Sequence, residues 1–282
     1  MQDEGNPCAE SSVSDLIQSD AASKPPDELP LSIQIENLSK WFGNRCAIDS
    51  LSLQIHEGEF FGFLGPNGAG KSTTIRMLCG LLRPDSGNAM VAGCSILTQT
   101  LELKRVIGAL PEEPALYERL TGFECLRFAG QMYGLERKEA QERASDLLGL
   151  MELTDERNKL IVDYSMGMKK KIALASALIH SPRVMFLDEP FNGIDPISVR
   201  SIRNVLRHLS ERGTTIFISS HVMEVIERLC SRVAIINQGK LVGVGTLSEL
   251  RNLSNVSSDT SLEDVFLKMV DANVDTETLS WL

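Results

Sequence analysis

The sequence has 282 residues, of which 43% are hydrophobic and 5% aromatic, and its formal net charge at pH 7 is −10. This length allows one large domain with a complete core and short appendages, and the many aliphatic residues favour an α/β fold. No apolar run reaches the ~18 residues of a membrane span, and the acidic N-terminus lacks a signal-peptide pattern, so we expect a cytoplasmic protein that touches a membrane only through a partner.

The negative charge is concentrated at the two ends. Residues 1–30 contain seven acidic residues and one lysine, and residues 252–282 contain six acidic residues and one lysine. We expect a disordered acidic leader over 1–30 and a short, solvated acidic tail over 252–282, on either side of one domain spanning 31–251. The middle of the chain is nearly neutral and offers no electrostatic footprint for nucleic acid.

The six cysteines are scattered, without a CxxC pair or a Cys/His cluster. We therefore predict no disulfide and no metal site among them. Cys79 and Cys230 stand in helical apolar patterns and are expected to be core thiols.

The domain is expected to open with an antiparallel β-layer. Residues 31–35 alternate between apolar and polar side chains, and a second alternating run, residues 51–55, follows a turn at Gly43-Asn44. This period of two is typical of strands with one buried face.

Residues 60–82 are the most informative stretch. A short apolar run is followed by a glycine-rich turn and by an apolar-periodic run that opens at Lys71, which is the strand–GxxxxGK[ST]–helix pattern of a P-loop. The backbone N–H groups of such a turn and the positive end of the helix form a cradle for phosphates. Lys71 would reach the β- and γ-phosphates, and the Ser72 hydroxyl would ligate Mg²⁺. We assign nucleotide binding to Gly65, Pro66, Asn67, Gly68, Ala69, Gly70, Lys71, Ser72 and Thr73.

Residues 115–160 are predicted to be a helical insertion, after short strands over 89–92 and 106–110. Thr121 and Glu124 have the spacing of a capping box, and the apolar residues that follow form one broad helical face. A second amphipathic helix is expected over about 137–150.

Strands and helices alternate in the rest of the domain. Ser165 is expected to cap a helix that runs to about His180, and Pro196 to open another that runs through Leu209. A third helix is expected over 222–229, and strands over 184–187, 214–219, 233–237 and 241–244, the last two as a hairpin. The predicted fold class is therefore α/β: a P-loop NTPase (RecA-like) parallel-sheet core with an antiparallel β-layer and an inserted α-helical subdomain.

Two carboxylates follow the apolar run 184–187. Asp188 ends this run, the place from which P-loop NTPases hold Mg²⁺, and Glu189 comes next, where it can point at the γ-phosphate and polarise the attacking water. The alternative, a pair of solvated surface acids, is disfavoured because the pair directly follows an apolar strand downstream of the P-loop.

The motif segments stand in the order of an ABC-type ATPase. Residues 60–82, 164–172, 184–196 and Ser219-Ser220-His221 resemble the nucleotide-binding subunits of ABC transporters, most closely the ABC-2-type exporter group, over about residues 31–250. SLEDVF near the C-terminus is similar to that group's tail. The resemblance implies ATP hydrolysis that drives an exporter. Two ATPase subunits, as a homodimer or a heterodimer, would hold two ATP molecules between them. The pair would bind a polytopic membrane subunit on the cytoplasmic face of the membrane.

The resemblance also carries roles onto single residues. Ser165 and Gly167 match the signature motif, here YSMGM, which grips the γ-phosphate of an ATP held by the other subunit; alone, this stretch reads as an ordinary serine-capped helix. Asp195 matches the loop that links the two ATP sites, although an aspartate before proline is also a plain helix cap. His221 matches the histidine that contacts the γ-phosphate, which completes a catalytic set of Glu189, His221 and Lys71.

Two further positions depend on the family pattern. Phe42 matches the aromatic residue that stacks on adenine, with Trp41 as the neighbouring alternative and plain hairpin packing as another. Glu112 stands where the family usually has a glutamine that reaches Mg²⁺ and the catalytic water. A glutamate can still ligate Mg²⁺ but adds a negative charge. The expected metal ligands are thus Ser72, Asp188 and Glu112.

Coupling to the membrane subunit is expected through residues 116–135, which carry more apolar side chains than one helical face needs, although part of that set packs inside the insertion. The first rival function is a soluble ABC ATPase acting in translation or DNA maintenance, which the single ATPase unit and the near-neutral core disfavour. The second is a non-hydrolysing regulatory module, which the intact Lys71, Asp188 and Glu189 disfavour. The transported substrate is not encoded in a recognisable way, because the cargo path belongs to the membrane subunit.

Overall fold

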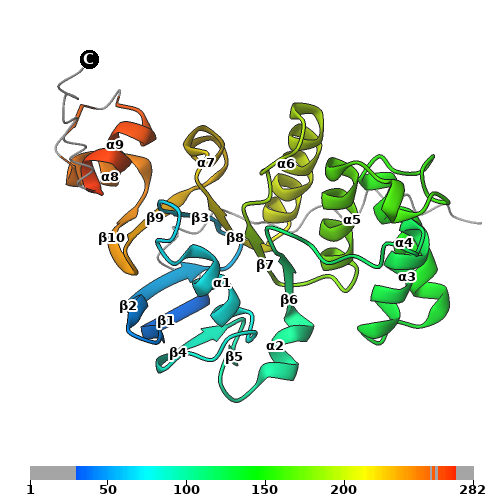
Figure 1. Ribbon diagram of the computed structural model, residues 1–282, viewed down its shortest axis with the longest axis horizontal. Coiled ribbons are helices and arrows are strands. Elements are labelled where there is room, and N and C mark those ends of the chain that lie inside the picture. Colours follow the sequence, from blue (N-terminus) through cyan, green and yellow to red (C-terminus); the bar gives the residue numbers. More distant parts are fainter. Residues whose placement is uncertain (1–29, 255, 258–259, 271–282) are drawn as a thin grey trace, which may run out of the picture.

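The computed structural model describes residues 30–254, 256–257 and 260–270. The predicted leader, apart from Pro30, lies outside the described residues. The described chain forms a four-stranded sheet in the order β2-β1-β4-β5 and a six-stranded sheet in the order β10-β9-β3-β8-β7-β6. Helices α3 and α4 lie at one end of the molecule and α8 and α9 at the other, with the sheets between them (Figure 1).

The strand pairing bears out the predicted two-part β structure. The four-stranded sheet is antiparallel and contains β1 (Leu31–Phe42), β2 (Arg45–His56), β4 (Ser86–Val91) and β5 (Cys94–Ser95). The six-stranded sheet contains β3 (Phe60–Leu64), β6 (Ile107–Leu110), β7 (Val184–Asp188), β8 (Thr215–Ser220), β9 (Arg232–Asn237) and β10 (Lys240–Gly245). Its pairs are parallel except for the β9–β10 hairpin, so the predicted parallel core, antiparallel layer and terminal hairpin are confirmed.

The helices surround these sheets. They are α1 (Lys71–Leu78), α2 (Thr100–Val106), α3 (Gly122–Met132), α4 (Arg137–Leu150), the 3₁₀ turn η3 (Ile161–Asp163), α5 (Met166–Leu178), α6 (Pro196–Glu211), α7 (Met223–Leu229), α8 (Leu247–Leu253) and α9 (Leu262–Met269). None of the helices within the described ranges is long and apolar enough to cross a membrane.

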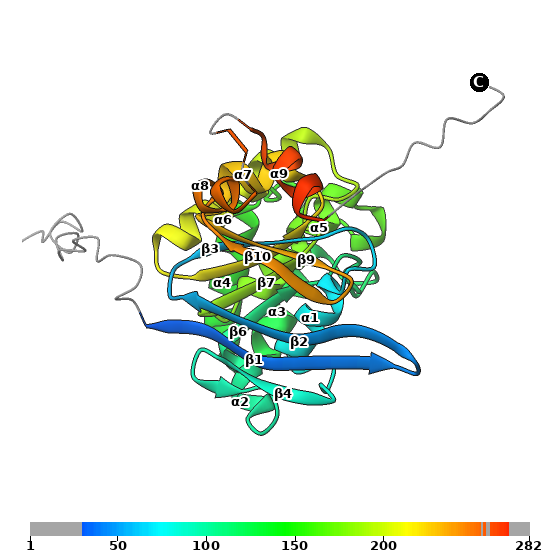
Figure 2. The same ribbon diagram turned by 90° about the vertical axis from the view of Figure 1, so that its left-hand side faces the viewer.

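A hydrophobic core covers each face of the six-stranded sheet, because successive side chains of a strand point to opposite faces. On β3, Phe61 and Phe63 pack with α1 and the antiparallel sheet, whereas Phe60 and Leu64 pack with the helices of the other face. Figure 2 shows the resulting layers, from the antiparallel sheet through α1 and the six-stranded sheet to the helices. Since both faces are covered, the central strands are buried along their whole length.

The helical insertion forms as predicted. The Thr121 hydroxyl accepts the backbone N–H of Glu124, and the Glu124 carboxylate accepts the backbone N–H of Thr121, which completes the capping box at the start of α3. Helix α4 has the expected bounds and packs on α3 through the buried Ala140, Ala144 and Leu148.

Two segments differ from the predictions. Helix α2 was not predicted, since only Leu103 of its seven residues is buried and it leaves little apolar periodicity in the sequence. The expectation of a solvated tail after residue 251 is wrong for the described part of that segment: α9 buries Leu262, Val265 and Phe266 in the main core and contacts α7 and α8. The remainder of the tail lies outside the described residues.

Candidate functional site

The ends of three neighbouring strands position the site. Strand β8 lies between β3 and β7, all three are parallel, and their carboxyl ends therefore meet at one edge of the sheet. The P-loop follows β3, Asp188 and Glu189 come at the end of β7, and His221 follows β8. The register pairs Asp188 with Ser219, so the two acidic residues and the histidine lie side by side.

The P-loop has the tight backbone that its glycines allow. A Cβ on Gly65 would lie 2.5 Å from the carbonyl oxygen of Ile236. Gly70 has a positive φ of 112°, and a Cβ there would clash with the Ile48 side chain. Helix α1 begins at Lys71, whose side chain turns back so that Nζ donates to the Gly65 carbonyl oxygen at 2.8 Å. The ammonium is thus held inside the loop, beside the first-turn N–H groups of α1.

Glu189 faces Lys71 across the site. Its Oε1 atom lies 3.4 Å from Lys71 Nζ, and both side chains are buried. Its Oε2 atom accepts hydrogen bonds from the His221 ring Nδ1 at 2.9 Å and from the His221 backbone N–H at 3.3 Å. The backbone of Glu189 is left-handed, with φ of 46°. Such a conformation costs a non-glycine residue about 1–3 kcal/mol and persists where the surroundings hold it, often in active sites.

Asp188 lies behind Glu189. Its Oδ1 atom accepts a 2.6 Å hydrogen bond from the Ser219 hydroxyl, which in turn accepts the Glu189 backbone N–H at 3.2 Å. The carboxylate is buried and lies outside the residues that line the cavity. Burial and, to a smaller extent, the Asp188 charge together raise the pKa of the nearby Cys79 thiol to about 12, which makes Cys79 the inert core thiol expected.

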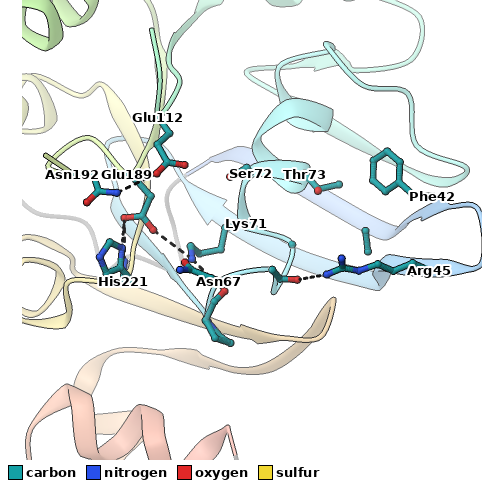
Figure 3. Close-up of a pocket in the computed structure, with 14 residues that line it drawn as sticks. Phe42, Arg45, Asn67, Lys71, Ser72, Thr73, Glu112, Glu189, Asn192 and His221 are labelled. Carbon is teal, nitrogen blue, oxygen red and sulfur yellow. Dashed lines mark hydrogen bonds and ion pairs between the residues drawn. The ribbon is translucent and has the colours of Figure 1, made fainter. Parts of the chain in front are cut away.

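The tip of the β1–β2 hairpin closes the other side of the site. Phe42 and Arg45 flank the two-residue turn and both line the cavity, whereas Trp41 does not. The Phe42 ring is half-exposed, and Arg45 Nη2 lies 3.4 Å from the Gly68 carbonyl oxygen. Of the two candidate aromatics, the structure thus places Phe42 beside the P-loop (Figure 3).

Glu112 extends from the loop after β6 into the same site. Its Oε1 atom accepts a 3.1 Å hydrogen bond from Asn192 Nδ2, and both residues line the cavity next to Glu189. Asn192, Arg45 and Ala47 are the cavity-lining residues that sequence reasoning missed. Their nearness in sequence to Glu189 and Phe42 was the one available signal.

Three predicted nucleotide contacts lie on a different surface. Ser165 caps α5 by accepting the Met168 backbone N–H, and Asp195 caps α6 by accepting the N–H groups of Ile197 and Ser198. A Cβ on Gly167 would lie 3.0 Å from an Asp195 carboxylate oxygen, so the two helix N-termini are neighbours. Backbone N–H donors hold the pKa of Asp195 below its usual range, chiefly that of Ser198. None of these three residues lines the P-loop cavity.

The cavity itself has a volume of about 580 Å³, within the ~300–1,000 Å³ range of small-ligand pockets. Its lining joins the residues predicted separately: Phe42, Pro66, Asn67, Gly68, Gly70, Lys71, Ser72, Thr73, Glu112, Glu189 and His221. The buried Oε1 atom of Glu189 accepts no hydrogen bond from the described residues and is ion-paired with the Lys71 ammonium at 3.4 Å. A buried ammonium, exposed backbone N–H donors and an aromatic rim at the far end match a nucleoside triphosphate in shape and charge.

Comparison with known proteins agrees with this geometry. The profile of the family described as ABC transporter matches residues 48–192, half of the chain. The chain is 43% identical over 231 residues to the linearmycin resistance ATP-binding protein LnrL of Bacillus subtilis (strain 168), which covers 82% of this chain and 74% of that protein. It is 40% identical over 211 residues to the bacitracin transport ATP-binding protein BcrA of Bacillus licheniformis, covering 74% of this chain and 68% of that protein.

A solved structure of the ATP-binding subunit of an ABC transporter superposes with a TM-score of 0.78 at 29% sequence identity. The superposition covers 84% of this chain and 98% of that one.

Proposed function

The chain belongs to the ABC transporter family as an ATP-binding and ATP-hydrolysing subunit of the exporter type, and from this premise we propose which residues carry each step. The rival function in translation or DNA maintenance is not favoured, because the relatives described above are resistance and transport ATP-binding proteins. One observation carries the proposal: Lys71, Glu189 and His221 converge in the cavity that the P-loop lines.

The chemical step is assigned to that group of three. Lys71 and the P-loop N–H groups bind the β- and γ-phosphates and neutralise the charge that develops on the transferred phosphoryl group. Glu189, whose carboxylate is held between Lys71 and His221, accepts a hydrogen bond from the attacking water and orients it. His221 holds the other carboxylate oxygen and reaches toward the γ-phosphate. Phe42 stacks on adenine at the hairpin tip.

Mg²⁺ is proposed to be held by Ser72, Asp188 and Glu112, and when bound it would neutralise phosphate charge. No three His, Cys, Asp or Glu side chains within the described ranges are grouped as a metal cage. A hydroxyl and two carboxylates fit Mg²⁺ none the less, because this ion is commonly bound through one or two carboxylates, waters and the phosphates of its substrate. Ser72 and Glu112 line the cavity, whereas Asp188 lies outside its lining and accepts the Ser219 hydroxyl.

ABC ATP-binding subunits work in pairs with a membrane permease, and we propose a partner subunit as the completion of each ATP site. Ser165, Gly167 and Asp195 are grouped at two helix N-termini but lie away from the P-loop cavity of their own chain. A helix N-terminus binds anions, so Ser165 and Gly167 at the start of α5 are suited to the γ-phosphate of an ATP held by the partner, and Asp195 caps α6 beside them.

The surface for the membrane permease is proposed to lie on residues 116–135. Tyr117 is 60% exposed, its ring contacts the edge of Phe128 at a centroid distance of 5.2 Å, and the two border an apolar hollow of about 550 Å³ together with Leu116 and Leu120. Leu116, Leu120 and Phe123 pack partly against the core, so only part of the apolar set is free for a partner. This contact would hold the subunit on the cytoplasmic face of the membrane. The ATPase domain in this proposal includes α9, since that helix packs into its core.

The assignment of the site is tested by the ATPase rate of the purified chain. Lys71→Ala removes the buried ammonium that faces the phosphates and should lower kcat by about a hundredfold or more, roughly 3 kcal/mol of transition-state stabilisation. Lys138→Ala, which removes a lysine that is 88% exposed on α4, is the matched control and should leave the rate unchanged. Hydrolysis by the Lys71→Ala variant at the control rate would place the ATPase site elsewhere.

A further inference from the structure

Lys170 is a buried lysine in the second turn of α5. Its side chain is only 2% exposed. Its ammonium donates a 3.1 Å hydrogen bond to a backbone carbonyl oxygen, that of Glu189. A buried ammonium is costly unless charges and acceptors around it compensate, so this position is expected to be surrounded by negative groups.

The surroundings of Lys170 are indeed acidic. It lines a hollow of about 490 Å³ together with Glu112, Glu113 and Asn192. Burial lowers the pKa of the Lys170 ammonium, and nearby carboxylates oppose that shift, Glu112 most strongly and then those of Glu189, Asp188 and Glu113. The positive charge of Lys170 therefore stands within the electrostatic reach of Glu112, which occupies the position where the family pattern usually has a glutamine.

The atom that Lys170 contacts is the carbonyl oxygen of Glu189, a residue whose backbone is held by several hydrogen bonds. The Glu189 carbonyl oxygen accepts both Lys170 Nζ and the Asn192 backbone N–H, the latter at 3.2 Å. On its other side, the Glu189 backbone N–H is held by Ser219. Since the left-handed φ of 46° is unfavourable for a glutamate, these contacts decide where its carboxylate points.

We propose that Lys170 is a positioning residue for hydrolysis: its ammonium holds the Glu189 peptide in its left-handed conformation and balances the charge that Glu112 adds to the site. Asn192 completes the arrangement, because its backbone N–H shares the Glu189 carbonyl and its side chain binds Glu112. The proposal rests on Glu189 being the carboxylate that orients the attacking water. It predicts that Lys170 and Glu112 act on turnover as a pair.

The test is steady-state ATPase kinetics of the full chain carrying Lys170→Met, Lys170→Gln, Glu112→Gln and the double variant Lys170→Gln/Glu112→Gln. Lys170→Met removes the donor and the charge at similar volume and should lower kcat about ten- to a hundredfold, while KM for ATP changes by less than about threefold. Lys170→Gln keeps a donor without the charge, and its cost should shrink to less than about threefold in the Glu112→Gln background. Lys169→Met, on the same helix turn but paired with Glu118, is the matched control and should turn over at the unaltered rate.

Four results would overturn the proposal. The first is an unchanged kcat in both Lys170 variants. The second is a raised KM with unchanged kcat, which would make Lys170 a nucleotide-binding residue. The third is a loss of activity that follows the fraction of protein unfolded in thermal melts. The fourth is an equal loss of kcat on Lys170→Gln in the Glu112 and Glu112→Gln backgrounds. Where Lys170→Met does not fold, Lys170→Gln supplies the same comparison. Glu189→Gln run in parallel separates the two levels: if it hydrolyses ATP normally, the assignment of Glu189 falls and this proposal with it. If Glu189→Gln is inactive and the Lys170 variants are normal, only the role of Lys170 is refuted.

Discussion

Replacing Glu189 by glutamine changes one charge at the point where the site is most crowded. The side chain keeps its size and an oxygen that can still accept from His221, which now holds Oε2 at 2.9 Å. What is lost is the negative charge that lies 3.4 Å from the Lys71 ammonium. With an effective dielectric constant of about 20, a pair at that distance attracts with about 5 kcal/mol. Burying an amide costs much less than burying a carboxylate, and that difference offsets most of this attraction in the folding balance.

The effect on catalysis should be much larger than the effect on folding. A positioned carboxylate that polarises water contributes about 10²–10⁴ in rate, which is about 3–5 kcal/mol of barrier. ATP binding should remain, because the P-loop donors and Lys71 are unchanged and one negative charge is removed from beside the γ-phosphate. We therefore expect Glu189→Gln to bind ATP, to lose turnover and to accumulate as an ATP-bound dimer.

The assays are kcat of the purified subunit, ATP affinity from a fluorescent analogue, and size-exclusion chromatography with Mg²⁺ and ATP. Glu142→Gln is the matched control, since that acid is 63% exposed on α4 and lies far from the cavity. A Glu189→Gln variant that turns over within about threefold of the control would refute the reasoning. A variant that loses ATP binding would show that Glu189 serves the ground state rather than the chemical step.

Three further predictions concern the proposed dimer contact, the proposed permease contact and the partly buried His180. Ser165→Arg places a cation at the start of α5 and should abolish ATP-driven dimerisation, while the affinity of the monomer for ATP stays within about threefold. Ser145→Arg on α4 is the control. An equal loss of ATP binding by the monomer would contradict action on the partner's ATP. Tyr117→Asp should keep the basal ATPase rate but weaken co-purification with the permease and lower transport about tenfold or more. Leu253→Asp, at a residue that is 62% exposed on α8, is the control and should leave co-purification and transport unchanged. Normal assembly of the Tyr117→Asp variant would place the docking surface elsewhere. His180 gives a pH dependence: its Nε2–H donates to the Ile107 carbonyl, its buried Nδ1 has no donor or acceptor among the described residues, and burial lowers its pKa, with Arg143 adding to the shift. As the pH falls, His180 of the unfolded chain is protonated before His180 of the folded chain. The contribution of neutral His180 to the free energy of unfolding is therefore complete above about pH 6.5 and decreases as the pH drops below that value. His180→Gln should reduce the difference between urea midpoints at pH 7.5 and pH 5.5, and an unchanged difference would remove His180 from this role.

The sequence by itself determined the local parts of this protein. The phosphate-binding loop is written in consecutive residues, because its glycines, its lysine and its helix start act within one turn of chain. The caps at Thr121, Ser165 and Asp195 were predictable for the same reason, since a side chain and the N–H groups two or three residues later form each of them. Hydrophobic periodicity, together with turn and cap residues, predicted most of the order of strands and helices, but not α2.

The tertiary structure decided which distant residues share a site. Phe42, Glu112, Glu189 and His221 meet at the P-loop because β8 lies between β3 and β7 and because a hairpin from another sheet reaches over the loop. No local pattern records that strand order. The role of Glu189 was predicted from its place after an apolar strand, but the family resemblance had to supply the roles of Phe42, Glu112 and His221.

Burial of charge was also decided by the fold. In the sequence, Lys169-Lys170-Lys171 is a run of like charges that suits a solvated face, yet Lys170 and Lys171 are buried and Lys169 is not. The acidic C-terminal segment also reads as solvated in the sequence, yet its helix α9 buries three apolar side chains against α7 and α8. A helix pattern states which residues share a face, but whether that face is covered depends on the element that packs against it, and only the complete chain in three dimensions supplies that element.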